Sequence, residues 1–228
     1  MLVKSRVSVI PEDIIQGYNE VSPATVGHFV WSGYMQPQIR CLVPGKKMVG
    51  PAFTVKIVGN DSAAVHVAVS MIEPGDVLVV DRSGDRTFAC IGGIAAAAAK
   101  ARGAAGIIVD GPVTDIQEIT ELGIPVFATG LSAVTTRVLG MFGEINTTVQ
   151  CGGTVVEPGD LVFADDNGVL VIKPDDAEQL LRAATHKEAS ETETLERLGR
   201  GELLADLSGA SALLDADVLS MIQKLKAR

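Results

Sequence analysis

The chain has 228 residues, of which 47% are hydrophobic, so it is long and apolar enough to bury one sizeable core. Its formal net charge of −9 leaves no basic face for nucleic acid and disfavours binding to anionic membranes. The sequence has no apolar run of ~18 residues, which a membrane span requires, and no cationic segment before an apolar core at its start. We therefore expect a cytoplasmic protein without nucleic-acid or membrane partners.

Cysteine usage agrees with that location. Cys41, Cys90 and Cys151 are scattered, and no two of them have metal-ligand spacing. An odd number of cysteines is also a poor disulfide framework. The sequence therefore predicts three reduced thiols.

Two short helices and a strand are predicted near the start of the chain. The first helix covers about residues 11–18, and the second begins with Ser22 as its cap and Pro23 in its first turn. An apolar strand follows over residues 49–58.

The next helix is predicted over residues 63–71, after a polar turn in which Asp61 or Ser62 serves as its cap. Similar turns then precede two apolar strands, because Glu-Pro-Gly-Asp occurs at residues 73–76 and again at residues 157–160. An internal duplication would explain this likeness, but Pro-Gly-Asp is good turn chemistry and explains it without one.

The most informative segment runs from Gly92 to Asp115. Gly92 and Gly93 open a helix, and the apolar strand after it ends in Asp-Gly-Pro at residues 110–112. Asp115 stands where the next helix begins, and Glu118 has the spacing of a capping box with it. In open α/β folds, ligands bind at the carboxyl ends of strands and at helix N-termini. The residues alone leave two interpretations of Asp115, a helix cap or a ligand of a bound group.

The rest of the chain predicts more strands and two further helices. The strands are expected at residues 126–129, 147–151, 154–156, 161–164 and 168–172. A long helix is predicted over residues 174–198, with Gly199 as its stop, and a last amphipathic helix over residues 210–225. We expect a single α/β domain over residues 1–203 and a C-terminal helical extension over residues 204–228.

Several of these segments resemble one known family. Residues 110–115, Asp-Gly-Pro-Val-Thr-Asp, resemble the Asp-Gly-x-x-Arg-Asp signature of that family, and residues 49–55, 73–81 and 151–160 are similar to three further family segments. Its members are the metal-dependent 4-hydroxy-4-methyl-2-oxoglutarate aldolases and the regulator of ribonuclease E activity A. The resemblance covers about residues 20–203.

The resemblance implies a fold, an assembly and a site. The fold is a central mixed sheet in an α/β/β/α arrangement with C-terminal helices, and the assembly is a homotrimer or homohexamer. Asp115 would be the direct ligand of Mg²⁺ or Mn²⁺, and hard cations of this kind need only one or two protein carboxylates. The turn of Gly92, Gly93, Ile94 and Ala95 would contact the substrate, whose carboxylate suits backbone N–H groups at a helix N-terminus.

Two positions depart from the aldolase pattern. Gly93 stands where that pattern has an acidic residue that orders metal-bound water, and Thr114 stands where it has the arginine that contacts the substrate carbonyl. A threonine hydroxyl is one neutral donor, whereas a guanidinium is a charged bidentate donor. Losing one such donor typically costs on the order of 10²–10³ in rate. The family's reaction should therefore be weak or absent, unless Arg82, Arg86 or Lys100 substitutes for the missing arginine.

Two further candidates come with open alternatives. His66 matches a histidine common in the family and serves either as a general acid or base or as a packed helical residue. The family also uses a glutamate of a neighbouring subunit near Glu188, Glu191 and Glu193, although these residues equally suit a solvated helix face.

Three functions follow from these residues. The first is a metal-dependent lyase, a class II aldolase or oxaloacetate decarboxylase, acting on a small 2-oxo acid such as 4-hydroxy-4-methyl-2-oxoglutarate or oxaloacetate. The second is a non-catalytic oligomeric regulator that binds a protein partner. The third is an enzyme with a changed substrate, because Gly93 and Thr114 both enlarge the pocket.

Overall fold

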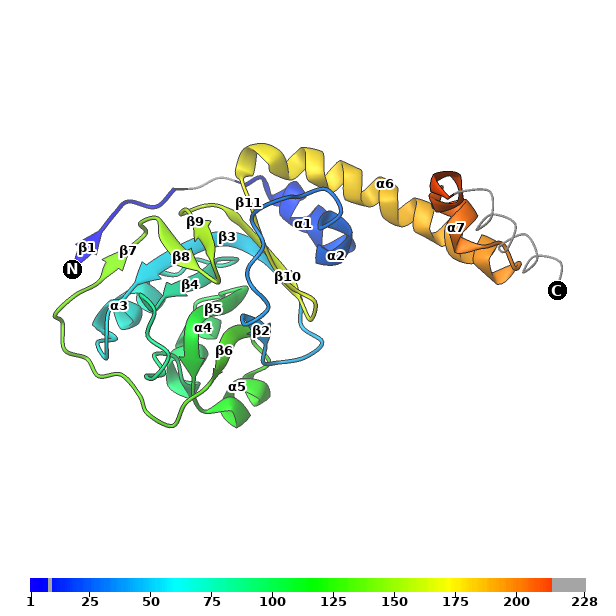
Figure 1. The fold of residues 1–228 in the computed structure, drawn as a ribbon. Coiled ribbons are helices and arrows are strands. Elements are labelled where there is room, and N and C mark those ends of the chain that lie inside the picture. The colour runs from blue at the N-terminus through cyan, green and yellow to red at the C-terminus, as the bar shows by residue number, and fades with distance from the viewer. Residues whose placement is uncertain (8–9, 215–228) are drawn as a thin grey trace. The chain divides into compact units, whose positions relative to one another are not determined.

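The computed structural model describes residues 1–7 and 10–214 (Figure 1). Its strands are β1 (Leu2–Val3), β2 (Arg40–Cys41), β3 (Met48–Lys56), β4 (Val77–Asp81), β5 (Gly106–Val113), β6 (Val126–Leu131), β7 (Glu144–Ile145), β8 (Val149–Cys151), β9 (Thr154–Val156), β10 (Leu161–Asp165) and β11 (Gly168–Ile172). Its helices are α1 (Glu12–Glu20), α2 (Pro23–Val26), α3 (Ala63–Met71), α4 (Gly93–Ala101), α5 (Ile116–Leu122), α6 (Pro174–Gly199), α7 (Leu204–Leu207) and a 3₁₀ helix over Ala210–Leu213.

The chain forms two compact units, residues 1–184 and residues 185–228. Helix α6 contributes residues to both units. The expected division between residues 203 and 204 stays a prediction. Of the predicted last helix, Ala210–Leu213 is a 3₁₀ helix, and the part beyond residue 214 lies outside the described residues.

A mixed sheet is the centre of the first unit. Among the described strands its order is β1-β7-β3-β4-β5-β6-β2, with β10 and β11 joined at β3. Strands β3, β4, β5 and β6 are parallel neighbours, and helices connect them in the βαβ manner. Their continuous runs of Val, Ile and Leu suit strands that are covered on both faces. In β4, for example, all five residues from Val77 to Asp81 are buried.

Strand β3 pairs in two different ways along its length. Its first half lies antiparallel to β10, with Met48 opposite Ala164 and Pro51 opposite Leu161. Its second half lies parallel to β4, and there Lys56 is the partner of Asp81. One strand therefore belongs both to the parallel sheet and to the β10–β11 hairpin.

The buried residues form apolar clusters that define the layers. Helices α3, α4 and α5 pack with one face of the parallel strands through a cluster that includes Val65, Ala96 and Ile119. The β8–β9 hairpin packs on the other face, and α1, α2 and the start of α6 cover the β10–β11 hairpin (Figure 1). This order confirms the expected central mixed sheet in an α/β/β/α arrangement.

Two local predictions concern helix caps. Ser22 is confirmed as the cap of α2, because its hydroxyl accepts a hydrogen bond from the Thr25 N–H at 3.1 Å. At the start of α3, Ser62 occupies the cap position without a capping bond from its side chain, and Asp61 accepts from the Ala63 N–H at 2.9 Å instead.

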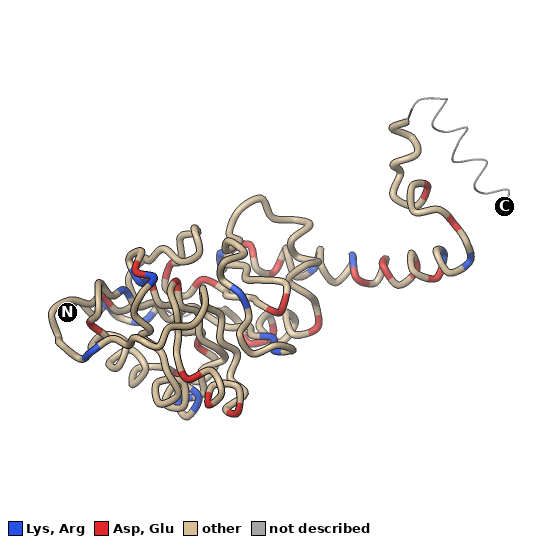
Figure 2. The backbone as a smooth tube through the Cα atoms, turned by 60° about the horizontal axis from the view of Figure 1, so that its bottom comes forward, with Lys and Arg blue, Asp and Glu red and all other residues tan. Residues whose placement is uncertain are grey.

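Charged residues of both signs are distributed along the chain, whose formal net charge is −9. Lys and Arg are interspersed with Asp and Glu along the described backbone (Figure 2). None of the helices in residues 1–7 and 10–214 is long and apolar enough to cross a membrane.

Candidate functional site

The turn before α4 and the connection from β5 to α5 are tied together at two points. The Thr114 N–H donates to the Ile91 carbonyl at 3.0 Å, and the Gly93 N–H donates to Asp115 Oδ2 at 2.9 Å. The first residues of α4 therefore lie against the segment that follows the carboxyl end of β5.

Gly92 permits this close approach. A Cβ atom at Gly92 would lie 2.5 Å from Asp115 Oδ2 and 2.9 Å from Thr114 Cγ2, which is closer than such atoms can come. At Gly93 a Cβ would lie 3.1 Å from Glu118 Cβ. The glycine pair thus has a steric reason, and the absence of a side chain at residue 92 leaves room for the Asp115 carboxylate.

Asp115 has an unusual backbone. Its φ of 54° and ψ of 46° place it in the left-handed region, which few residues other than glycine occupy. Strained residues of this kind cluster at functional sites. Its side chain makes no capping bond to α5, so the expected capping box with Glu118 is wrong. The carboxylate instead accepts from the first N–H of α4 and from the Thr114 hydroxyl, 3.3 Å from Oδ1.

These residues line a pocket of about 420 Å³. Of the candidates from the sequence, the pocket brings together His66, Gly92, Ile94, Ala95, Thr114 and Asp115. Gly93 does not line it, and its N–H is occupied by Asp115. The N–H groups of Ile94 and Ala95 donate to no acceptor in the described part of the chain. The candidate anion-binding amides are therefore those of Ile94 and Ala95.

Sequence reasoning missed the remaining polar wall of this pocket. Ser62, Ser70, Thr135 and Thr136 contribute to it, and the two threonines lie in the long connection between β6 and β7. This connection has no periodic pattern that would mark it in the sequence. A buried carboxylate, Asp61, holds it in place.

Asp61 has no exposed surface and accepts hydrogen bonds from two parts of the chain. Its donors are the backbone N–H groups of Ala63, Leu139, Gly140, Met141 and Phe142. Desolvation by itself would raise the pKa of Asp61, but the backbone donors outweigh it and hold the pKa well below its ordinary value. Asp61 therefore stays ionised and joins the helix that carries His66 to the connection that carries Thr135.

None of the basic residues proposed as substitutes for the missing arginine lines this pocket. The Arg82 guanidinium is buried and donates to the Gly59 carbonyl and to Asp85 Oδ1, each at 2.9 Å. Arg86 pairs with Asp110 at 2.9 Å in a different cavity, and Lys100 donates to a carbonyl at the end of α5. Within one chain, Thr114 is the donor that occupies the arginine's place.

The described side chains around the pocket offer one carboxylate to a metal ion, that of Asp115. No group of three or more His, Cys, Asp or Glu residues among residues 1–7 and 10–214 is arranged to hold a metal ion. A lone carboxylate fits Mg²⁺ or Mn²⁺, which keep several water ligands, and does not fit a structural zinc site. Asp115 has this character, since a carboxylate has about four acceptor positions and, among the described residues, two hydrogen bonds reach it.

The cysteines are free thiols, as expected. Burial raises the pKa of Cys90, in the wall of the pocket, to about 12 and that of Cys41 to about 11. Burial also raises the pKa of Cys151 well above its usual value. All three thiols therefore remain protonated near neutral pH and are poor nucleophiles.

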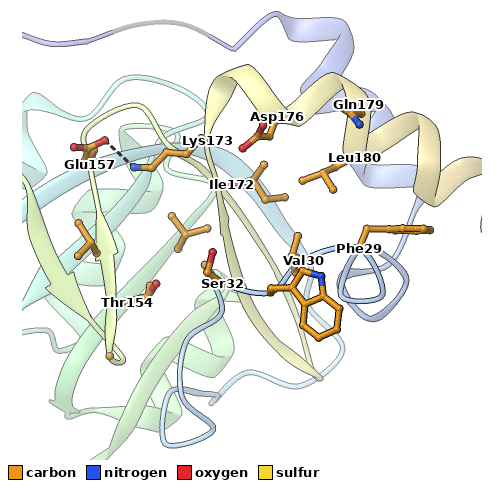
Figure 3. A pocket seen from close by; sticks show the side chains of 15 residues that line it. Phe29, Val30, Ser32, Thr154, Glu157, Ile172, Lys173, Asp176, Gln179 and Leu180 are labelled. Carbon is orange, nitrogen blue, oxygen red and sulfur yellow. Dashed lines mark hydrogen bonds and ion pairs between the residues drawn. The ribbon is translucent and has the colours of Figure 1, made fainter.

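A second, larger hollow of about 890 Å³ lies beside the β10–β11 hairpin and the start of α6 (Figure 3). Phe29, Val30 and Leu180 form its apolar part, and the ion pair between Lys173 and Glu157 forms its polar side. Trp31, the only tryptophan of the chain, also lines it with 96% of its surface exposed.

Fold and pocket together define a class of protein. It is an α/β protein with a pocket between a helix N-terminus and the segment after a parallel strand. The chain belongs to the RraA-like family, described as Aldolase/RraA, whose model matches residues 24–171. This match confirms the resemblance seen in the sequence.

The similar proteins include one named as an aldolase and others named as RraA inhibitors. A provisionally named 4-hydroxy-4-methyl-2-oxoglutarate aldolase of Halalkalibacterium halodurans is 38% identical over 153 residues, 67% of this chain and 72% of that protein. RraAS2 of Streptomyces coelicolor, an unusual member of the RNase ES inhibitor RraA family, matches with a TM-score of 0.70 and 27% identity, over 87% of this chain and 100% of that one. The RNA-processing inhibitor RraA of Thermus thermophilis matches with a TM-score of 0.57 and 28% identity, over 61% and 84% of the two chains.

Proposed function

We propose that the protein is a divalent-metal-assisted lyase that cleaves or decarboxylates a small 2-oxo acid in the 420 Å³ pocket. The observation that carries this proposal is the position of Asp115. A strained carboxylate with free acceptor capacity lies beside the amide-lined start of a nine-residue helix. This combination suits a cation and the carboxylate of a small acid at adjacent places.

Each residue of the pocket has a role in this proposal. Asp115 would hold Mg²⁺ or Mn²⁺, which when bound supplies a Lewis acid for the 2-oxo group. The N–H groups of Ile94 and Ala95, with the positive end of the α4 dipole, orient the substrate carboxylate. The Thr114 hydroxyl donates toward developing negative charge, and His66 is the candidate that moves a proton.

Two tests address this proposal directly. Calorimetry with Mn²⁺ should give saturable binding to the wild type and none to Asp115→Asn, which keeps the shape of the side chain and removes its charge. Asp13→Asn, the same change on the exposed face of α1, is the matched control and should bind like the wild type. Equal Mn²⁺ affinity of Asp115→Asn and wild type would exclude Asp115 as the ligand.

The second test is turnover. With Mg²⁺ and oxaloacetate, the wild type should release pyruvate slowly and Asp115→Asn should not exceed the metal-only rate. A rate in Asp115→Asn equal to that of the wild type would reject a lyase that works at this pocket.

A protein-binding regulator is the second candidate, favoured by the exposed aromatic side chains of Trp31 and Tyr34. Because Trp31 is the only tryptophan, intrinsic fluorescence reports on this surface directly. Adding a ribonuclease E-type enzyme should shift the emission to shorter wavelength if the partner covers Trp31, and Trp31→Ala should weaken the complex. Unchanged emission at saturating partner would exclude this surface as the contact.

A further inference from the structure

A row of polar residues crosses the carboxyl ends of three parallel strands on the sheet face opposite α3, α4 and α5. Alternation along a strand places every second residue on the same face. On that face Val79 of β4 and Ile108 of β5 belong to the apolar cluster under the β8–β9 hairpin. Two residues further on, the same face presents Asp81 and Asp110. On β3 the same face contains Ala52 and, four residues later at the end of the strand, Lys56.

The strand register brings these side chains next to one another. Lys56 is the direct partner of Asp81, and the pairing of Val80 with Val109 puts Asp110 beside Asp81. An apolar sheet face thus ends in a charged row. The carboxyl edge of a parallel sheet is where α/β proteins bind ligands.

The row lines a cavity of about 550 Å³, separate from the Asp115 pocket. Its remaining wall includes Gln36, Ser83, Arg86 and Gln150, the last from the β8–β9 hairpin. An adjoining hollow of about 400 Å³ shares Gln36, Arg86 and Asp110 with this cavity and extends the cavity toward β6. This volume suits a small molecule, and the charged and amide wall requires that molecule to be hydrophilic.

The charges of the cavity are only partly matched within the chain. Asp81, with 6% of its surface exposed, accepts from the Ser83 N–H at 2.6 Å and from the Gln150 N–H at 3.2 Å. Arg86 pairs with Asp110 at 2.9 Å, and its side chain is 52% exposed. The Lys56 ammonium makes no hydrogen bond or ion pair with any residue in the described part of the chain.

We propose that this cavity is a second ligand site, which binds a small polyhydroxylated anion, a sugar acid or a sugar phosphate. The Lys56 ammonium and the exposed edge of the Arg86 guanidinium receive the anionic group. Asp81 and Asp110 keep acceptor positions for hydroxyl groups, and the amides of Gln36 and Gln150 can donate or accept. The Asp115 pocket is on the other side of the sheet, so this site does not depend on the proposed lyase function.

Calorimetry on the full-length protein tests the site with four probes. Gluconate and glucose 6-phosphate carry both an anion and hydroxyl groups, whereas glucose lacks the anion and acetate lacks the hydroxyl groups. We expect saturable binding of at least one of the first pair and at least about 10-fold weaker binding of glucose and acetate. The preferred member of the first pair identifies the anion as carboxylate or phosphate.

Variants locate the binding. Lys56→Met keeps the length of the side chain and removes its charge, so it should weaken binding at least about 10-fold, and Lys56→Arg should restore most of it. Lys46→Met, on an exposed turn, and Asp115→Asn in the other pocket should bind like the wild type. Gln150→Ala gives a second change in the wall if Lys56→Met unfolds, as judged by circular dichroism.

Two kinds of result would contradict a ligand site at Lys56. No binding of either polyhydroxylated anion to the wild type at millimolar concentration would overturn the proposal. Binding that survives Lys56→Met and Gln150→Ala, or that is lost in Asp115→Asn, would place the ligand elsewhere and overturn it as well.

Discussion

The Asp61 carboxylate stabilises two segments of the chain. It accepts hydrogen bonds from a backbone N–H in the first turn of α3 and from four successive backbone N–H groups of the β6–β7 connection. Removing its charge should therefore destabilise the fold and loosen the pocket wall at Thr135. We predict that Asp61→Asn lowers the free energy of unfolding by about 3 kcal/mol, in the range of hydrogen bonds to a charged group. Denaturant titration measures this, with the exposed Asp175→Asn as the control that should change little.

The lowered pKa of Asp61 makes its contribution to the free energy of unfolding depend on pH. The pKa of Asp61 is lower in the folded protein than in the unfolded chain, so its stabilisation is complete above the unfolded pKa near ~4 and is lost as the pH falls through the folded pKa. The difference in unfolding free energy between wild type and Asp61→Asn should be constant near neutral pH and shrink below about pH 4. A difference that grows as the pH falls would contradict this assignment.

Restoring the family's residues at positions 114 and 93 should increase oxaloacetate decarboxylation. Thr114→Arg supplies a charged donor beside Asp115, and the double variant with Gly93→Asp should decarboxylate oxaloacetate about 10²-fold faster than the wild type. Gly93→Asp by itself should gain less, because it offers no donor to the developing charge.

The backbone and surroundings of Gly93 decide whether the double variant can fold. Gly93 is the first residue of α4 and lies outside the left-handed region, so an aspartate there does not need a positive φ. The remaining risk is contact with Glu118, whose Cβ would lie 3.1 Å from the new Cβ. Melting temperatures should be compared before rates, and a folded, metal-binding double variant with no gain would mean that the pocket serves another substrate or no chemistry.

At the scale of elements, the start of α4 is the most constrained junction. Gly92→Ala places a Cβ 2.5 Å from Asp115 Oδ2, which forces the carboxylate to move, so we predict a loss of Mn²⁺ binding with the fold retained. Calorimetry and circular dichroism measure the two effects. Gly199→Ala makes the same change at a glycine with open space around it and should leave both unaffected.

Periodicity predicted the elements that form the pocket well and their contacts less well. Helix α3 was predicted at its observed bounds, and the parallel strands followed from apolar runs between turns. The capping box at Asp115 failed because local spacing cannot reveal a donor from a different helix, here the Gly93 N–H. Thr135 and Thr136 could not be found, since a tertiary contact with Asp61 positions their irregular segment.

At the scale of the whole molecule, exposed apolar side chains around the Asp115 pocket predict an assembly. Ile94 is 87% exposed and Met141 70%, and Leu131 at the end of β6 and Val134 in the β6–β7 connection are exposed as well. Patches of this kind mark subunit interfaces. We predict a homotrimer or homohexamer by light scattering, and Ile94→Asp should shift it toward smaller species. A wild type that is only a ~24 kDa monomer would contradict the prediction, since closed symmetry requires at least two chains.

The double pairing of β3 also bears on synthesis of the chain at the ribosome. Its first half has to wait for β10, which follows more than a hundred residues later, and only its second half can pair early with β4. Such long-range closure slows folding, and an unpaired strand edge invites association between nascent chains. Fragments that end before Leu161 should therefore aggregate, whereas fragments that extend through Ile172 carry both partners of β3 and should remain dispersed.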